Sequence, residues 1–370
     1  MPPVTIMVKP ASSDCNMRCR YCFYSDVASR RECASMGRMS SSTLENLVRR
    51  AMRYADGQLT LAFQGGEPTL AGLDFYRELI RYEKMYNAKG LRVCNAIQTN
   101  GYALSDEMLD FFVREGFLIG VSFDGTPEIH DRLRVDAAGN GTSPRVLDTL
   151  RRLRDRGAEC NVLCVVNRYV AEKPEEVFRF LAPYGYIQYI ACMDDLDGSL
   201  SPHSLTAEAY GRFLKKSFDL YYESYKRNRF VSIRNFDNYL AILSGGQPES
   251  CGMCGVCSRY FLIEADGGVY PCDFYVLDQW HMGNVNDSSF FTLAQSPVAQ
   301  RFVEESRPVN RACRGCRWFF LCRGGCKRDR EAFEEGQPGQ NKWCRAFQDL
   351  FEYAYPRMLE MAKYRSGKRM

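Results

Sequence analysis

The apolar residues in the first half of the chain fall into short, nearly continuous runs separated by longer amphipathic stretches. Runs of this kind are typical of parallel strands that are buried on both faces. The pattern predicts six strands, over residues 4–8, 58–63, 91–98, 117–123, 160–166 and 186–191.

The stretches between these runs repeat their apolar residues at helical spacing, as in SSTLENLVRRAMRYA (41–55). There Ser42 is followed three residues later by Glu45, a pattern that predicts a capping box. Alternating strands and helices favour a parallel sheet with right-handed crossovers. Six such steps fall short of the eight in a closed barrel. We therefore predict an α/β fold, a partial (β/α)6 barrel whose ligands bind at the carboxyl ends of the strands.

The amino-acid composition changes in the second half of the chain. A loop rich in Asp, Ser, Gly and Pro (194–204) and a helix near 206–228 come first. After Cys251, cysteines become dense and glycines frequent. We predict two domains: a partial barrel with a connecting helix in residues 1–234, and a cysteine-rich module with a final helix in 235–370.

Composition narrows the class of protein. Hydrophobic residues make up 45% and charged residues 25% of the 370 positions, which excludes a disordered chain or a collagen. The net charge of +4, from 49 basic and 45 acidic residues, gives no support for a nucleic-acid partner. No apolar run approaches the ~18 residues of a membrane span. The N-terminus lacks the pattern of a signal peptide, so we expect a cytoplasmic protein without a membrane partner.

The chain has 17 cysteines and only three histidines. An odd number of cysteines without an export signal argues against a disulfide framework, so we expect reduced thiols, many of them bound to metal. Ligation by thiolates alone suits zinc or iron–sulfur clusters. Five scattered cysteines, mostly in strand-like surroundings, are predicted to be buried structural thiols: Cys33, Cys94, Cys160, Cys164 and Cys192.

Three cysteines stand in a C-x3-C-x2-C pattern just after the first predicted strand: Cys15, Cys19 and Cys22. Three thiolates on one loop can hold three irons of a [4Fe–4S] cluster and leave the fourth iron open for chemistry. A structural zinc site with a distant fourth ligand is the alternative at this point.

A second cysteine group, Cys313-x2-Cys316-x5-Cys322-x3-Cys326, has a more specific spacing. Cys344 follows it, and four further cysteines precede it: Cys251, Cys254, Cys257 and Cys272. Spacing alone permits either fully ligated iron–sulfur clusters or a pair of zinc ribbons.

Several motifs in order along the chain resemble the radical S-adenosylmethionine (SAM) superfamily. They are the first cysteine pattern, Gly65-Gly66-Glu67-Pro68 after the second strand, and Ser122-Phe123-Asp124-Gly125 after the fourth. Glycines allow close backbone approach to a ligand, and an arginine can pair bidentately with a carboxylate. The resemblance implies a cluster held by the first three cysteines, and SAM contacts by Tyr21, Gly66, Ser122, Arg134 and Met193. The alternatives are an ordinary turn at the glycines and a surface salt bridge at Arg134.

The later cysteines resemble a SPASM domain, beginning with Cys257-x9-Gly267-x4-Cys272. This resemblance implies two further [4Fe–4S] clusters, three in all. The first auxiliary cluster would use Cys251, Cys257, Cys272 and Cys326. The second would use Cys313, Cys316, Cys322 and Cys344. Cys254 would not be a ligand, although an exchange of partners within C-x2-C-x2-C stays open.

Within the superfamily, AFQGGEPTLAG (62–72), SFDGTPEIH (122–130) and VYPCDFYVLD (269–278) resemble the anaerobic sulfatase-maturating enzymes. The resemblance implies oxidation of a cysteine or serine in a sulfatase polypeptide to Cα-formylglycine, through a 5′-deoxyadenosyl radical that abstracts the Cβ hydrogen. It also implies that Asp273 is the catalytic base. Gln64 and Tyr24 flank the predicted SAM pocket, so we expect them to position the substrate. The alternative for Asp273 is a carboxylate that accepts backbone hydrogen bonds in a turn.

The expected partners are a C/S-x-P-x-R-like segment of a sulfatase and a flavodoxin or ferredoxin as electron donor. Two other functions stay open from the residues. One is another SPASM peptide maturase, for example one that forms a thioether cross-link, although only fourteen residues precede Cys15 and leave no room for a peptide-binding domain. The other is a zinc or iron–sulfur protein without catalysis. Cysteine and serine both stay open as the target residue.

Overall fold

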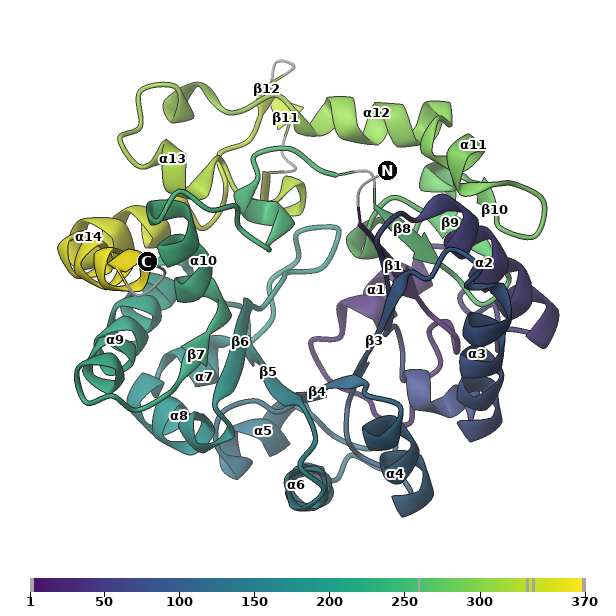
Figure 1. The fold of residues 1–370 in the computed structure, drawn as a ribbon. Coiled ribbons are helices and arrows are strands. Elements are labelled where there is room, and N and C mark those ends of the chain that lie inside the picture. The colour runs from purple at the N-terminus through teal and green to yellow at the C-terminus, as the bar shows by residue number, and fades with distance from the viewer. Residues whose placement is uncertain (1–2, 259, 331–332, 335–336, 368–370) are drawn as a thin grey trace.

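The computed structural model describes residues 3–258, 260–330, 333–334 and 337–367. Within these residues ten strands form one sheet, in the order β10-β9-β8-β1-β2-β3-β4-β5-β6-β7 (Figure 1). The strands are β1 (Val4–Val8), β2 (Gln58–Phe63), β3 (Arg92–Thr99), β4 (Leu118–Ser122), β5 (Cys160–Val166), β6 (Tyr186–Ala191), β7 (Ser232–Ile233), β8 (Phe261–Ile263), β9 (Gly268–Tyr270) and β10 (Gly283–Asn284).

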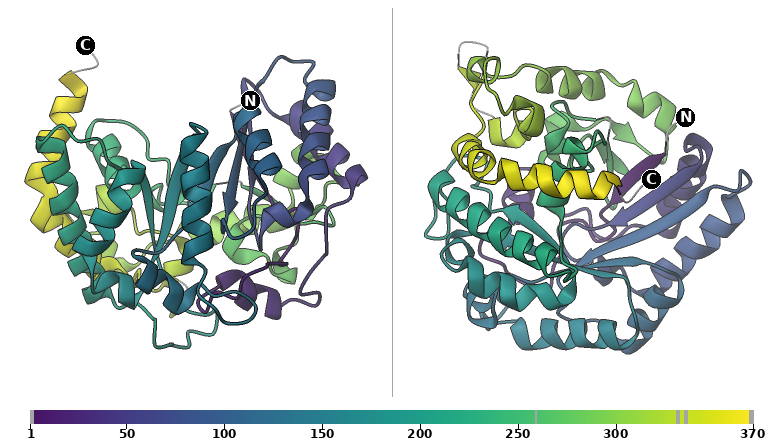
Figure 2. Two further views of the ribbon diagram at one scale, coloured as in Figure 1. Left: turned by 90° about the horizontal axis from the view of Figure 1, so that it is seen from below. Right: turned by 60° about the vertical axis from the view of Figure 1, so that its left-hand side comes forward.

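The helices are α1 (Phe23–Ser29), α2 (Ser41–Tyr54), α3 (Leu73–Tyr86), α4 (Asp106–Arg114), α5 (Pro127–Leu133), α6 (Ser143–Asp155), α7 (Arg168–Ala171), α8 (Pro174–Leu181), α9 (Ala207–Lys226), α10 (Arg234–Leu243), α11 (Phe290–Ala294), α12 (Pro297–Ser306), α13 (Phe319–Cys322) and α14 (Cys344–Gly367). Helices α2, α3, α4, α6, α8 and α9 lie on the outside of the curved sheet, whereas α12 and α13 lie at its open side (Figure 1 and Figure 2). No helix among the described residues is long and apolar enough to cross a membrane.

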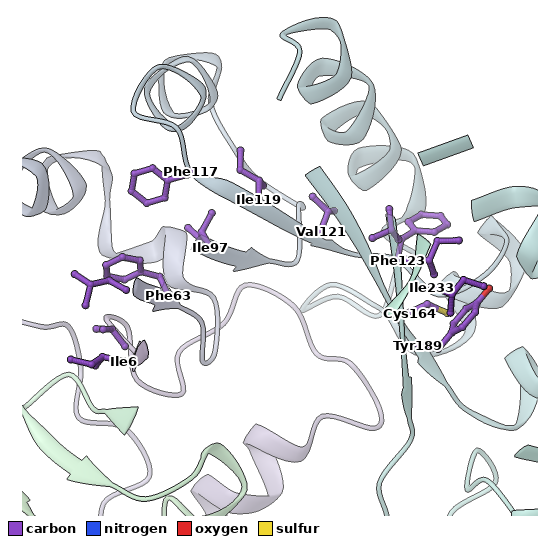
Figure 3. Close-up of a cluster of buried hydrophobic side chains, with 14 of the residues drawn as sticks. Ile6, Phe63, Ile97, Phe117, Ile119, Val121, Phe123, Cys164, Tyr189 and Ile233 are labelled. Atoms are coloured by element: carbon purple, nitrogen blue, oxygen red, sulfur yellow. The ribbon is translucent and has the colours of Figure 1, made fainter. Parts of the chain in front are cut away.

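The six predicted strands are present, and β1 to β6 pair in parallel along the sheet. Four of them have the predicted bounds, and β3 and β4 differ at their ends by one residue. Alternate residues of β2, β3 and β5 are buried, and β1 and β4 each have three consecutive buried residues. Ile6, Phe63, Ile97 and Val121 belong to this buried layer (Figure 3). Because these strand residues are buried, they are apolar, and this is why the sequence predicted the strands.

The predicted capping box at the start of α2 is wrong. The helix begins at Ser41, and the N-cap is Ser40, whose hydroxyl accepts a hydrogen bond from the backbone N–H of Thr43. Ser42 therefore lies inside the first turn, where its position relative to Glu45 no longer forms the reciprocal pair.

The cysteine-rich half does not fold apart from the sheet. Its strand β8 pairs in parallel with β1, and β9 and β10 continue the sheet in antiparallel fashion. At the other edge, α14 packs along α9 and α10. The boundary near residue 234 stays a prediction, since α10 begins at Arg234 and both halves contribute to one sheet.

The scattered cysteines agree only partly with the prediction. Cys164 and Cys192 are buried, and Cys94 and Cys160 are half-buried. Cys33 is exposed and its thiol donates to the carbonyl of Ser35, so the prediction of a buried thiol is wrong there. This residue follows α1 in a loop, directly after three charged residues, Arg30, Arg31 and Glu32.

Candidate functional site

The first three cysteines share one neighbourhood on the loop between β1 and α1. The Sγ atom of Cys15 accepts hydrogen bonds from the Met17 backbone N–H at 3.4 Å and from the Asn100 amide at 3.6 Å. The pKa of Cys19 is raised to about 12, chiefly by burial; the charge of Arg134 opposes this rise, and the charges of Cys22 and Cys15 add to it. Thiols of this kind release their protons when a cation binds them, as cluster ligation requires.

Glu67 of the glycine-rich motif ties the ends of β2 and β3 to this loop. Its carboxylate is fully buried and accepts hydrogen bonds from the Thr69 backbone N–H (3.0 Å) and hydroxyl (2.7 Å). It also accepts from the Thr99 hydroxyl at 2.8 Å and the Asn100 backbone N–H at 2.7 Å. Because the Asn100 side chain contacts Cys15, Glu67 indirectly positions a predicted cluster ligand.

Steric fit and backbone conformation explain why Gly65 and Gly66 are glycines. The backbone N–H of Gly66 donates to the Ser12 carbonyl at 2.9 Å. A Cβ atom on Gly66 would lie 2.1 Å from the carbonyl oxygen of Asp14, and Gly65 has a φ of +121°. Gly66 therefore sits directly against the backbone of the cysteine loop, where a side chain does not fit.

Arg134 forms a buried ion pair and not a surface salt bridge. It is 6% exposed, and its Nε atom lies 3.0 Å from Oδ2 of the buried Asp124. Its Nη2 atom donates to Oδ1 at 3.3 Å, and the Tyr21 hydroxyl donates to the same carboxylate. Asp124 stands in the Ser122-Phe123-Asp124-Gly125 motif after β4, but nothing in the sequence indicated this pairing. Nη1 of Arg134 takes no part in this ion pair, and the contact of Arg134 with SAM stays a prediction.

The remaining predicted SAM residues lie at strand ends. The Ser122 hydroxyl, at the end of β4, accepts a hydrogen bond from the Gln98 side chain at 3.0 Å. Met193 is half-buried just beyond β6, and its carbonyl accepts from the Cys192 thiol at 3.8 Å. Their roles toward SAM stay predictions.

The four cysteines predicted to hold the first auxiliary cluster come together from three segments. Burial raises the pKa of Cys272, and the nearby Cys326 and Cys251 raise it further. Cys257 and Cys251 likewise interact with Cys326. Cys254 is exposed and its thiol donates to the Ser250 carbonyl at 3.6 Å.

The four cysteines predicted to hold the second auxiliary cluster line one pocket, together with Trp318, Gln340 and Gln348: Cys313, Cys316, Cys322 and Cys344. Burial raises the pKa of Cys322 to about 11, and the other three raise it as well. The Gln340 amide donates to the Cys344 Sγ atom at 3.1 Å. Soft sulfur donors around a pocket, with amide groups directed at sulfur, fit an iron–sulfur cluster.

Asp273 contacts Tyr24, so the structure joins the segment after β9 to helix α1. The Tyr24 hydroxyl donates to Oδ2 of Asp273 at 2.7 Å. The Oδ1 atom is buried and has no hydrogen-bond partner among the described residues. Burial raises the pKa of Asp273 to about 6, although the charge of Lys9 opposes this shift. Gln64, near the same loop, donates to the Met7 sulfur.

A buried ion cluster beside this pair is a feature that the sequence did not predict. Lys9 and Arg31 both contact Glu264, with Nζ–Oε1 and Nη1–Oε1 distances of 2.9 and 2.8 Å. The Lys9 ammonium also lies 5.1 Å from the centre of the Tyr24 ring. These contacts join the ends of β1 and β8 next to Tyr24. The buried charges are paired, as expected for charged groups away from water.

Comparison with known proteins identifies the two domains and the family of this chain. The radical SAM superfamily matches residues 10–181, and an iron–sulfur cluster-binding SPASM domain matches residues 251–317. A cysteine-type anaerobic sulfatase-maturating enzyme of Clostridium novyi (strain NT) is 41% identical over 98% of both chains. The chain belongs to the anaerobic sulfatase-maturating enzyme family.

Two further relatives of this family bear on the target residue and the site. A serine-type enzyme of Bacteroides thetaiotaomicron is 30% identical over 98% of this chain and 92% of its own. The solved structure of native anSMEcpe with bound AdoMet and Kp18Cys peptide has a TM-score of 0.94 at 38% identity, covering 98% of this chain and 100% of that one. The predicted fold class, a radical SAM partial barrel with a SPASM domain, is confirmed.

Proposed function

We propose that this chain oxidises a cysteine in a sulfatase polypeptide to Cα-formylglycine. Its family supports the reaction, and the preference for cysteine is supported by 41% identity to a cysteine-type enzyme against 30% to a serine-type one. The observation that carries the chemistry is Asp273, which has one carboxylate oxygen bonded to Tyr24 and the other buried without a partner among the described residues.

The chain offers a place for each cofactor of the family. Cys15, Cys19 and Cys22 would hold the cluster that binds SAM, and the two groups of four cysteines would hold the auxiliary clusters. SAM would lie along the carboxyl ends of the strands, against Tyr21, Gly66, Ser122, Arg134 and Met193. When bound, the reduced cluster and SAM supply a 5′-deoxyadenosyl radical, which takes a hydrogen atom from the substrate Cβ.

Asp273 is suited to the proton transfer that must follow. After loss of the Cβ hydrogen atom, the substrate still has to give up one proton and one electron to form a thioaldehyde. The buried Oδ1 atom can accept the proton from the thiol, while the Tyr24 hydroxyl fixes the orientation of the carboxylate through Oδ2. The preceding residue, Cys272, is a proposed ligand of the first auxiliary cluster. The proton would pass from the substrate to Asp273 and the electron to the adjacent cluster, so both acceptors lie side by side.

The product needs only water to finish the reaction. Hydrolysis of the thioaldehyde replaces sulfur by oxygen and releases sulfide, whereas a serine would give the aldehyde directly. Gln64, directly after β2, and Tyr24, in the first turn of α1, would position the substrate segment of C-x-P-x-R type. A flavodoxin or ferredoxin in the cytoplasm would supply the electron that starts each turnover.

A pair of matched peptides tests this function. The reconstituted protein is incubated anaerobically with SAM, dithionite and peptides that contain C-x-P-x-R or S-x-P-x-R. The proposal predicts a loss of about 18 Da from the cysteine peptide, with 5′-deoxyadenosine formed, and slower loss of about 2 Da from the serine peptide. Deoxyadenosine without a change in either peptide would contradict it and point to another peptide maturase. A faster reaction of the serine peptide would contradict the cysteine preference alone.

A further inference from the structure

The indole N–H of Trp318 is a buried hydrogen-bond donor that has no acceptor among the described residues. Trp318 is 4% exposed, and its ring lies 5.8 and 5.1 Å, centre to centre, from the rings of Phe351 and Tyr355. Packing therefore fixes the indole in place. A buried N–H without an acceptor is unfavourable, so its position calls for an explanation.

The location of Trp318 explains why its indole N–H is buried without an acceptor. The residue lines the same pocket as the four cysteines of the second group, at the N-terminus of the short helix that carries Cys322. Two further side-chain donors reach sulfur atoms of this group. The Gln340 amide donates to Cys344 at 3.1 Å, and the Gln348 amide lies 3.9 Å from the Cys316 sulfur.

We propose that Trp318, Gln340 and Gln348 form a set of N–H donors to the sulfur atoms of the second auxiliary cluster, and that Trp318 raises the reduction potential of that cluster. The inference rests on the proposed ligand set for this cluster. It concerns positioning residues that act on the cofactor and not on the substrate.

The direction of the effect follows from charge. Reduction adds one electron to the cluster and its thiolates, so their sulfur atoms become better acceptors. Hydrogen bonds to a charged acceptor are about twice as strong as neutral ones, which stabilises the reduced state more than the oxidised state. Hydrogen bonds to the sulfurs are an established means by which proteins set cluster potentials.

The Trp318→Phe variant tests the role of the N–H, because it keeps an aromatic ring in the pocket and removes only the donor and part of the ring. Potentials are measured on the intact, reconstituted protein by anaerobic redox titration followed by electron paramagnetic resonance. We expect the equilibrium constant for reduction of the second auxiliary cluster to fall about tenfold, which corresponds to about 59 mV for one electron. The proton coupling of the reduced cluster that disappears on exchange into D2O should be weaker in the variant than in the unmodified protein, because only the Gln340 and Gln348 donors of the set remain.

Trp280→Phe is the matched control. Trp280 is 6% exposed and packs against Tyr275 and Phe302, and it is not among the residues that line the pocket. The potential of the second auxiliary cluster should not change in this variant. Gln340→Leu, at an exposed position that tolerates substitution, should shift the potential in the same direction as Trp318→Phe by a smaller factor.

The Cys313→Ser variant distinguishes an error in the proposed ligand set from an error in the role of Trp318. If Cys313→Ser leaves the signals of all three clusters intact, the ligand set is wrong and the inference falls with it. If Cys313→Ser removes one cluster, but Trp318→Phe and Gln340→Leu both keep its potential and its coupled proton, the inference alone is overturned.

Discussion

Replacing Asp273 with Asn removes the acid–base chemistry of the carboxylate and keeps its size. In the structure, Oδ2 accepts a hydrogen bond of 2.7 Å from Tyr24, while Oδ1 is buried without a partner among the described residues. The Asn carbonyl can keep the bond from Tyr24, and the Asn NH2 group would then take the place of Oδ1. We expect this variant to fold and to bind its clusters as the unmodified protein does.

The expected effect on catalysis is large because a positioned general base contributes about 10²–10⁴ in rate. At about 1.36 kcal/mol per factor of ten, this equals about 3–5 kcal/mol of lost transition-state stabilisation. Abstraction of the Cβ hydrogen precedes proton transfer, so formation of 5′-deoxyadenosine should fall less than tenfold. The ratio of formylglycine to deoxyadenosine should therefore fall sharply, which an unfolded or cluster-free protein would not produce.

The assay measures both products from the same anaerobic reaction by liquid chromatography and mass spectrometry. Asp278→Asn is the matched control, since Asp278 is exposed and accepts a hydrogen bond of 2.9 Å from the Glu32 backbone N–H. Its product ratio should match that of the unmodified protein. An Asp273→Asn protein that forms formylglycine within tenfold of the unmodified rate would refute the assignment of the base.

Three further predictions concern the loop, the cysteines and the pH dependence of stability. Gly66→Ala should lose cluster iron and SAM affinity, measured by iron analysis and calorimetry, because its Cβ would lie 2.1 Å from the Asp14 carbonyl; unchanged SAM affinity would contradict the close fit. Cys254→Ser should keep the iron content of the unmodified protein, whereas Cys251→Ser should lose one cluster; the reverse result would show that the two cysteines exchange roles. Glu83 is 7% exposed, and burial raises its pKa to about 7, above its unfolded value. The folded state therefore prefers the protonated acid, so the free energy of unfolding should fall by up to about 3 kcal/mol as the pH rises from about 4.5 to 7, and Glu83→Gln should remove this slope in thermal unfolding of the apo-protein.

Much of the barrel could be predicted because its signals are local. A strand with one face buried and the other half-buried still favours a mostly apolar run, and the runs that became β1, β2, β5 and β6 ended at the predicted residues. The motifs at the strand ends could likewise be placed on one edge of the sheet, since parallel strands carry their carboxyl ends together.

The contacts between distant segments could not be predicted in the same way. Strand β8 has only three residues and gains its place by pairing with β1, more than 250 positions earlier in the chain. The buried cluster of Lys9, Arg31 and Glu264 carries no local pattern, because charged residues in a sequence normally indicate a surface. Arg134 could be singled out, but not its pairing with Asp124, since burial and direction of a side chain depend on the packed fold.

The central claim is that this chain removes a hydrogen atom from the Cβ atom of a substrate cysteine and converts that residue to formylglycine. The most direct measurement uses a C-x-P-x-R peptide whose cysteine carries two deuterium atoms on Cβ. We predict 5′-deoxyadenosine that has gained one deuterium, and a formylglycine peptide that keeps the other. Deoxyadenosine without deuterium, together with an unmodified peptide, would contradict the account.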